Sequence, residues 1–194
     1  KPIKSNNVDL SLAWYGSRGH AFSAAYFGKN IHDFITSGSY TEQVLGYTVQ
    51  ITSPVNGDSA KINGGEIAYQ QLYDNGLGYQ LNYTYVDNVA YTTVNGVTVK
   101  TGLDGVSRNT YNITGLYEKG PWSARLSYSY RGGYVDCASC GPTGGGNPAG
   151  PTSVEKAGFL DFSGSYQINP TYTVYLDDTN LTGESLHRYA GDLR

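Results

Sequence analysis

The sequence contains no methionine, not even at position 1, and we therefore expect that residues preceding Lys1 were removed from the translated product. No apolar run approaches the ~18 residues of a membrane-spanning helix, which excludes helical spans. Membrane-spanning strands stay open, because their sequence signal is far weaker. Lys and Arg number 13 against 16 Asp and Glu. Because there is no basic excess, the chain is not expected to bind nucleic acid.

Cysteine is also scarce, with only Cys137 and Cys140, in a stretch rich in Gly and Pro. A zinc site needs four ligands, and no second cysteine pair or nearby histidine pair completes one. A redox Cys-x-x-Cys motif usually opens a helix in a thioredoxin-like setting, which the sequence lacks. We therefore predict a disulfide that stiffens a surface loop in an oxidising compartment, in preference to a metal or redox site.

Tyrosine and glycine are abundant instead, with 19 Tyr and 26 Gly against 5 Phe. In the stretch WSARLSYSYR (122–131), Trp122, Leu126 and Tyr130 share one parity, and Arg125 lies on the other with the serines. Successive side chains of a strand point to opposite faces, so this pattern predicts a strand with one apolar and one polar face. Similar alternation predicts strands over residues 7–15, 20–35, 61–73, 77–86, 107–118, 122–131, 158–168 and 171–181.

Short and long connections alternate between these strands. The short ones are turns at 16–19, 74–76, 118–120 and 169–170, and the long ones cover about 36–60, 87–106 and 132–157. In an up-and-down meander, all short turns then lie at one end and all long loops at the other, as in outer-membrane barrels. Residues 45–51 also alternate, but another spanning strand here would break this order. We expect them to be a hairpin arm within the first long loop.

The face that carries the tyrosines is expected to meet lipid rather than a second sheet. A soluble β-sandwich also alternates, but it would bury these tyrosines, and buried hydroxyls need partners. At a membrane interface the ring lies in lipid and the hydroxyl among the headgroups. Charged side chains should then keep to the inner parity, because a Lys or Arg on the lipid face costs about 2–4 kcal/mol at mid-membrane. Those expected to do so are Asp9, Glu66, Arg108, Arg125, Arg131, Asp161 and Asp177.

Several blocks, in their order and spacing, resemble the C-terminal half of the TonB-dependent outer-membrane receptor barrel, particularly the branch found in Caulobacter- and Xanthomonas-like bacteria. They are NVDLSLAWY (7–15), KNIHDFI (29–35), SPVNGDSAKINGGEIAYQQLYDNGLGYQLNYTYVDN (53–88), SRNTYNITGLYEKGPWSARLSYSYRGGY (107–134) and LDFSGSYQINPTYTVYLDDTNLTGES (160–185). The resemblance implies an all-β, antiparallel up-and-down transmembrane β-barrel of 22 strands with an N-terminal plug. Residues 1–194 would supply about eight consecutive strands, roughly the fourteenth to the twenty-first. Because the family's plug, TonB-box segment and closing strand are not among these residues, we expect a partial barrel domain.

No catalytic, cofactor or metal site is predicted, because His20, His32 and His187 lie far apart and none belongs to a nucleophile motif. Some inner-face charges are expected to contact the plug or a passing substrate, or simply to line a wet lumen: Glu66, Arg108, Arg125, Arg131 and Asp161. Ligand recognition is expected in the loops, where rings can stack on a sugar and amides or carboxylates can bind its hydroxyls. The candidates are Tyr40, Tyr47, Asn56, Asp58, Asn88, Tyr91, Asn95, Tyr134, Asp136 and Asn147.

The resemblance implies active uptake of a scarce nutrient, either an oligosaccharide or a ferric siderophore-type chelate, across the bacterial outer membrane. The expected partners are the rest of the barrel and its plug, the TonB complex acting through the plug segment, outer-membrane lipid, and a surface lipoprotein as a further candidate. Two alternatives stay open. One is a complete eight-stranded outer-membrane barrel with a structural or adhesive role, and the other is a secreted β-sandwich binding module.

Overall fold

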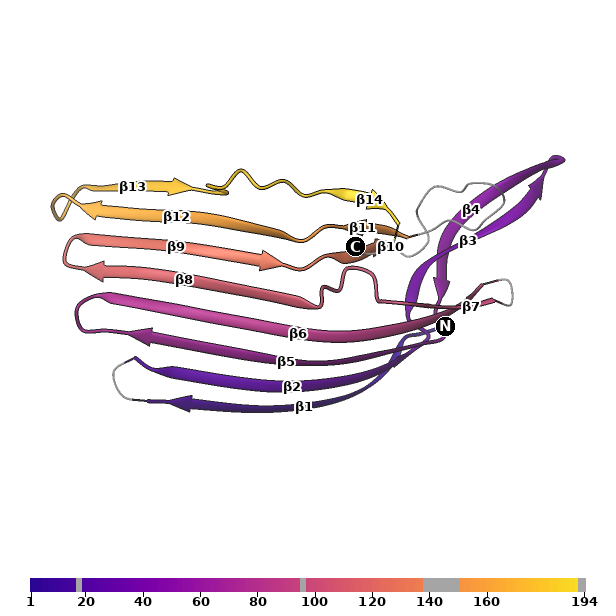
Figure 1. The fold of residues 1–194 in the computed structure, drawn as a ribbon, viewed down its shortest axis with the longest axis horizontal. Helices are drawn as coiled ribbons and strands as arrows, with labels where there is room; N and C mark the ends of the chain where they lie inside the picture. Colours follow the sequence, from indigo (N-terminus) through magenta and orange to yellow (C-terminus); the bar gives the residue numbers. More distant parts are fainter. Residues whose placement is uncertain (17–18, 95–96, 138–150, 192–194) are drawn as a thin grey trace.

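The computed structural model describes residues 1–16, 19–94, 97–137 and 151–191. Its main sheet is antiparallel, in the order β1-β2-β5-β6-β8-β9-β12-β13, with β7 added beside β6 (Figure 1). The predicted all-β fold and the order of the expected strands are confirmed. No helix in the described part of the chain is long and apolar enough to cross a membrane. The strands of this sheet are β1 (Lys4–Tyr15), β2 (Ala21–His32), β5 (Ser59–Leu72), β6 (Leu77–Val94), β7 (Val97–Thr101), β8 (Asn109–Lys119), β9 (Trp122–Arg131), β12 (Ala157–Gln167) and β13 (Thr173–Asp178).

The β5–β6, β8–β9 and β12–β13 turns lie at one end of the main sheet, on the left in Figure 1, and the long connections lie at the other, as predicted. The β5–β6 turn is tight because Gly76 adopts φ 91°, a conformation that side-chain-bearing residues rarely take. The backbone N–H of Leu77 also donates to Asn75 Oδ1 over 3.0 Å. In the β12–β13 turn, Asn169 Oδ1 accepts hydrogen bonds from the backbone N–H groups of the residues that follow it.

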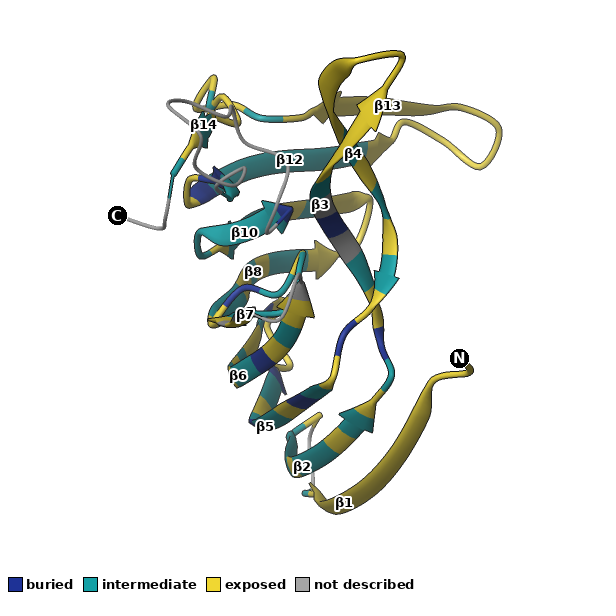
Figure 2. Ribbon diagram, turned by 90° about the vertical axis from the view of Figure 1, so that its right-hand side faces the viewer, coloured by how far each residue is buried: buried dark blue, intermediate teal, exposed yellow. Residues whose placement is uncertain are grey.

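The first long connection is a hairpin, made of β3 (Ile35–Val44) and β4 (Tyr47–Asn56). It turns at Leu45 and Gly46, which both have positive φ, as type I′ hairpin turns require. The predicted hairpin arm at residues 45–51 is therefore confirmed, although the arm runs on to Asn56. Figure 2 shows this hairpin on the concave side of the curved main sheet.

The other two long connections are also more ordered than the sequence predicted. β6 continues to Val94 and pairs with β7, so much of the second connection extends the main sheet. The third contributes to a separate sheet of β10 (Tyr134–Cys137), β11 (Thr152–Val154) and β14 (Arg188–Ala190). β14 lies far along the chain and pairs with β11, so the segment after β13 is held against this loop.

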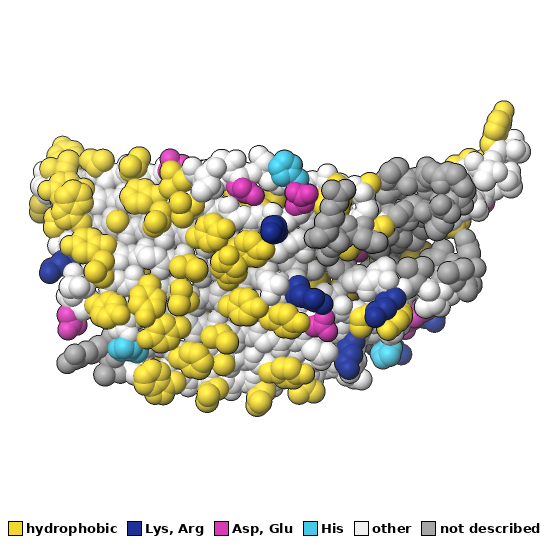
Figure 3. Space-filling view, viewed as in Figure 1, with side chains coloured by type: hydrophobic (Ala, Val, Ile, Leu, Met, Phe, Trp, Pro, Cys, Tyr) yellow, Lys and Arg dark blue, Asp and Glu magenta, His cyan; other side chains and the backbone are white. Residues whose placement is uncertain are grey.

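The main sheet is one curved layer with two different faces (Figure 2). Cα partners in adjacent strands share a face. One row of such partners, all on the same face, consists of Leu12, Ala24, Ile67, Tyr83, Tyr111 and Tyr130. Hydrophobic side chains are spread over this convex face (Figure 3). The side chains of the predicted apolar parity therefore lie on the convex face, and those of the polar parity lie on the concave face.

Nothing in the described structure covers the convex face. Leu10 and Leu176 are 72% and 65% exposed, although they lie within the strands. The buried hydrophobic cluster is small and lies at the long-loop end, where Phe34 packs with Ala60 and Ala90. A β-sandwich would instead bury this apolar face under a second sheet. The sandwich alternative is therefore wrong.

The main sheet is open in the part of the chain that the structure describes. β1 pairs only with β2, and β13 pairs only with β12. A complete eight-stranded barrel would need β1 and β13 to pair with each other, so that alternative does not match this structure. Each edge leaves a row of backbone N–H and C=O groups for further strands to pair with.

Candidate functional site

The concave face carries uncharged polar side chains in two neighbouring rows. One row consists of the successive Cα partners Gln70, Gln80, Thr114 and Ser127. In the next row, Asn82 partners Asn112. The hydroxyls of Thr114 and Ser127 lie 3.0 Å apart and hydrogen-bond across the strands. We call the set the amide wall: Gln70, Gln80, Asn82, Asn112, Thr114 and Ser127.

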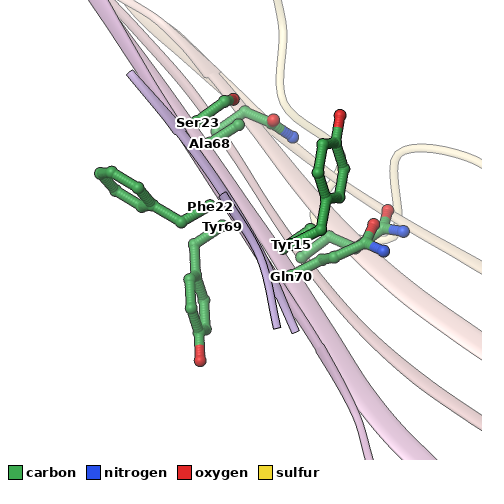
Figure 4. Close-up of a pocket in the computed structure, with 9 residues that line it drawn as sticks. Tyr15, Phe22, Ser23, Ala68, Tyr69 and Gln70 are labelled. Carbon is green, nitrogen blue, oxygen red and sulfur yellow. The ribbon is translucent and has the colours of Figure 1, made fainter. Parts of the chain in front are cut away.

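A shallow depression of about 220 Å³ lies against one end of the amide wall, near the short turns. Its lining includes Tyr15, Ser23, Gln70, Gln80 and Asn82. Figure 4 shows the alternation that builds it, because Phe22 and Tyr69 point to the opposite side of the strands from Ser23 and Gln70. The depression offers hydroxyl and amide groups beside one aromatic ring, which is a surface suited to polar, uncharged solutes. Sequence reasoning did not single out these residues.

Three of the predicted lumen residues lie on the concave face with the amide wall. Glu66 partners Thr84, Arg125 partners Ser163, and Asp161 partners Ser127. The Asp161 carboxylate also accepts a hydrogen bond of 2.8 Å from the backbone N–H of Asn180, so it helps to fix the segment that follows β13. Contact of these side chains with a plug or a substrate stays a prediction.

Arg131 also lies on this face, but its guanidinium is occupied by neighbouring groups. It donates to Ser107 Oγ over 2.9 Å and to the carbonyl oxygen of Gly105. Its Cζ lies 3.9 Å from the centre of the Tyr134 ring, a cation–π distance. Arg131 therefore ties the segment before β8 to the start of β10.

The expected inward position of Arg108 is not what the structure shows. Arg108 precedes β8, and its guanidinium lies 3.2 Å from the Asp87 carboxylate. Asp87 has the same parity as Tyr83 and Tyr85, so this ion pair lies on the convex face. The alternation of side chains predicted the wrong face for Arg108, because this residue lies outside the strand, where successive side chains no longer point to opposite faces.

Four of the predicted ligand residues hold loops together. Asn56 donates from Nδ2 to the carbonyl oxygens of Asp33 and Lys1, at 2.9 and 3.1 Å. The Asp58 carboxylate accepts from Thr93 Oγ1 over 2.7 Å. The remaining two contacts are Asn88 Oδ1 accepting from the backbone N–H of Leu103 (2.6 Å) and Asp136 pairing with Arg188 (3.1 Å). These polar atoms already have hydrogen-bond or ion-pair partners within the loops, so they can form fewer hydrogen bonds with a ligand.

The predicted ligand tyrosines are dispersed. Tyr47 is 75% exposed near the tip of the β3–β4 hairpin, and Tyr40 is half-buried on β3. Tyr91 has the parity of the convex face, since it partners Ser59. Tyr134 lies under Arg131. The structure therefore does not bring these rings together into one site.

Three predicted residues, Asn95, Asn147 and Cys140, lie outside the described residues. Cys137, the other cysteine of the chain, is disulfide-bonded, in agreement with the predicted disulfide.

Of the histidines, His20 contacts a tyrosine, with its Nδ1 3.3 Å from the Tyr69 hydroxyl. Within the described ranges, no group of three or more His, Cys, Asp or Glu side chains is placed to hold a metal ion.

The family model described as TonB dependent receptor-like, beta-barrel, matches residues 1–181. The chain belongs to the TonB-dependent receptor barrel family. No curated protein and no solved structure matches it. Members of this family are outer-membrane transporters rather than enzymes, and they work with a plug and with TonB. The family prediction made from the sequence blocks is confirmed, and the described strands are a segment of such a barrel.

The aromatic side chains of this receptor barrel segment pack in pairs on the convex face. The rings of Tyr111 and Tyr130 stack with centroids 4.6 Å apart, and those of Trp122 and Tyr166 lie 4.2 Å apart. Belts of Tyr and Trp are typical of membrane–water interfaces.

At the β5–β6 turn, desolvation and then the neighbouring Tyr79 raise the pKa of the Tyr73 phenol above its ordinary value.

Proposed function

We propose that this chain forms part of the wall of an outer-membrane barrel that takes up a scarce nutrient in a TonB-dependent process. The observation that carries the proposal is a single-layer sheet with an apolar convex face and a polar concave face, within a family match over residues 1–181. Hydrocarbon contact suits the convex face, since exposed apolar area of this extent otherwise needs a partner. A water-filled lumen suits the amide wall.

The open edges of the sheet specify the first partner. Unpaired backbone groups are not tolerated in hydrocarbon, so further strands must pair with β1 and β13 to close the barrel. Residues 1–194 would then be a partial barrel domain. The family supports a plug inside that barrel and TonB beneath it. The concave face, with Glu66, Arg125 and Asp161, is the surface that a plug would meet. A surface lipoprotein stays a candidate at the long-loop end.

Of the two substrate classes, we favour an oligosaccharide over a ferric siderophore-type chelate. The amide wall and the adjoining depression offer neutral donors and acceptors, which pair with sugar hydroxyls without discriminating by charge. Tyr15 adds an aromatic ring at the depression. A chelate with a net negative charge would bind better to clustered cations. Two cations flank the wall in the part of the sheet that the structure describes, Arg125 on one side and Arg131 on the other. The Arg131 guanidinium is already bound by Ser107 and Gly105.

The test combines genetics and fractionation. A strain that lacks the gene should grow normally on glucose but poorly when an imported oligosaccharide is the limiting carbon source. A strain that lacks TonB should show the same defect, and the protein should be found in the outer-membrane fraction. A growth defect only under iron limitation would replace the oligosaccharide with a chelate. Growth that is independent of TonB would contradict the proposed process itself.

A pair of neighbouring positions tests the concave face. The double substitution Gln80→Leu with Asn82→Leu removes two amides from the wall and should slow oligosaccharide uptake several-fold at limiting concentration. Leu81→Val changes the residue between them, on the convex face, and should leave uptake unchanged. Equal uptake by the two variants at wild-type surface abundance would show that the solute does not pass along this wall.

A further inference from the structure

The side chains of the convex face change from apolar to mainly polar toward the long-loop end of β1, β2, β5, β6 and β7. The last apolar row there includes Tyr26 and Tyr85. Successive rows on one face are two residues apart, or about 7 Å. The next rows outward are mainly polar, with one valine in each. The first holds Val8, Asn63 and Asp87, and the second holds Asn30, Lys61 and Val89. The outermost row consists of the successive partners Lys4, His32, Ser59, Tyr91 and Lys100.

Three lysines lie in these outer rows and Arg108 lies beside them, paired with Asp87; Figure 3 shows Lys and Arg side chains grouped on this part of the surface. We call them the basic collar: Lys4, Lys61, Lys100 and Arg108. All four are exposed. Two acids border them, Asp87, which pairs with Arg108, and Asp58, which accepts a hydrogen bond from Thr93. No described acidic side chain lies within ion-pair distance of the three lysines, so the collar keeps a cationic excess.

We propose that the basic collar binds phosphate-bearing lipid headgroups in the membrane leaflet at the long-loop end. This inference rests on the proposed function, because it takes the convex face to contact lipid. The collar begins directly beyond the row of Tyr26 and Tyr85, and Tyr91 lies in its outermost row. Tyrosines mark the level where acyl chains give way to headgroups. Lysines just beyond that level are therefore placed at the depth of anionic headgroup oxygens.

The shape of the collar favours a lipid surface over a single soluble anion. Its lysines belong to three different strands and spread over a convex surface, away from the depression beside the amide wall. Exposed, strongly hydrated ammonium groups act as point charges on flexible stems and can follow laterally mobile headgroups. The attraction is additive over neighbouring cations and weakens with salt, since it falls off within a Debye length.

The experiment compares three variants of the full-length gene product, purified in detergent from its own outer membrane. The collar variant is Lys4→Gln, Lys61→Gln and Lys100→Gln. The control variant, Lys29→Gln, Lys119→Gln and Lys156→Gln, removes the same charge elsewhere. Lys29 is the closest match to the collar lysines. It lies on β2 at the long-loop end, like them, but its side chain has the parity of the concave face. A third variant with Arg at the three collar positions keeps the charge.

Binding of purified lipopolysaccharide, a phosphate-bearing lipid, is measured for each variant, with phosphatidylcholine and inorganic phosphate as comparison probes. The collar variant should bind lipopolysaccharide tenfold to a hundredfold more weakly, on the order expected for loss of three lysines at a membrane surface. The control and Arg variants should bind like the wild type, and phosphatidylcholine should show no difference between variants.

Four results would overturn the inference. Equal losses in the collar and control variants would show that total charge matters and the collar does not. Displacement of the lipid by millimolar inorganic phosphate would identify a soluble-anion site instead. If the protein is absent from the outer membrane, the proposed function fails and the collar fails with it. Normal outer-membrane location together with unchanged lipopolysaccharide binding overturns the collar alone.

Discussion

The guanidinium of Arg108 and the carboxylate of Asp87 lie 3.2 Å apart on the convex face, one row beyond Tyr85. The two side chains are 66% and 57% exposed. An ion pair in water contributes little, whereas a pair inside hydrocarbon would be strongly coupled, since water no longer screens it. Its coupling energy therefore reports where the hydrocarbon ends.

The first prediction is that this pair lies in water or among headgroups. A double-mutant cycle of Asp87→Ala and Arg108→Ala should give a coupling free energy of about 1 kcal/mol or less. The measurement is urea unfolding of the intact protein in lipid vesicles, repeated at high salt, which should reduce the coupling further. A coupling energy well above this value, insensitive to salt, would place the pair within hydrocarbon and move the membrane boundary past Tyr85.

A second prediction concerns two adjacent residues of β6 on opposite faces. Leu81 is on the convex face near the middle of the apolar rows, and Asn82 is on the amide wall. Leu81→Arg should lower the free energy of unfolding in lipid vesicles by about 2–4 kcal/mol, because the charge enters hydrocarbon. Asn82→Arg should change it much less, because the lumen is wet. Similar costs for both substitutions would mean that lipid does not cover the convex face.

Much of the fold could be predicted from alternation and turns. The clearest segments, such as residues 77–86 and 122–131, became β6 and β9 because every second side chain is apolar. The strands missed were those without that signal. β7 and the outer part of β6 pair mainly through Thr and Val on both parities, and β11 has only three residues. In such segments backbone pairing, not a buried face, sets the strand.

The site was harder to predict than the fold. Charge drew attention to the carboxylates and guanidinium groups, while the neutral amide wall gave no comparable signal. Polar loop residues such as Asn56 and Asn88 suggested ligand binding, yet they brace the loops. A sequence shows which side chains carry donors and acceptors, but it does not show which of these atoms the fold itself consumes.

A third prediction follows from the contacts of Arg131. Arg131→Ala removes the hydrogen bonds to Ser107 and Gly105 and the cation–π contact with Tyr134. Because hydrogen bonds to charged groups are worth about 1.5–3 kcal/mol, the segment around residues 103–107 should open more easily. Hydrogen–deuterium exchange there should speed up by tenfold or more. Arg125→Ala is the matched control, since no contact of that guanidinium was found among the described side chains. Equal exchange in both variants would show that Arg131 does not hold this segment in place.

The last prediction concerns close packing on the concave face. A methyl group added at Gly64 would meet the Phe27 ring and the carbonyl oxygen of Tyr85, and the carbonyl is backbone that cannot swing away. Gly115 lies on the convex face, between Tyr79 and Leu126, and there no neighbouring heavy atom lies within 4 Å of such a methyl group and φ is not positive.

Gly64→Ala should therefore lower the free energy of unfolding by about 1–3 kcal/mol, the usual cost of overpacking. Gly115→Ala should be neutral or stabilise by up to about 1 kcal/mol, because it only restricts the unfolded chain. Both are measured by urea unfolding of the intact protein in lipid vesicles. The two substitutions are chemically identical, so propensity alone would shift them equally. If Gly64→Ala stabilised the protein as much as Gly115→Ala, the close approach of β2, β5 and β6 at Phe27 would be wrong.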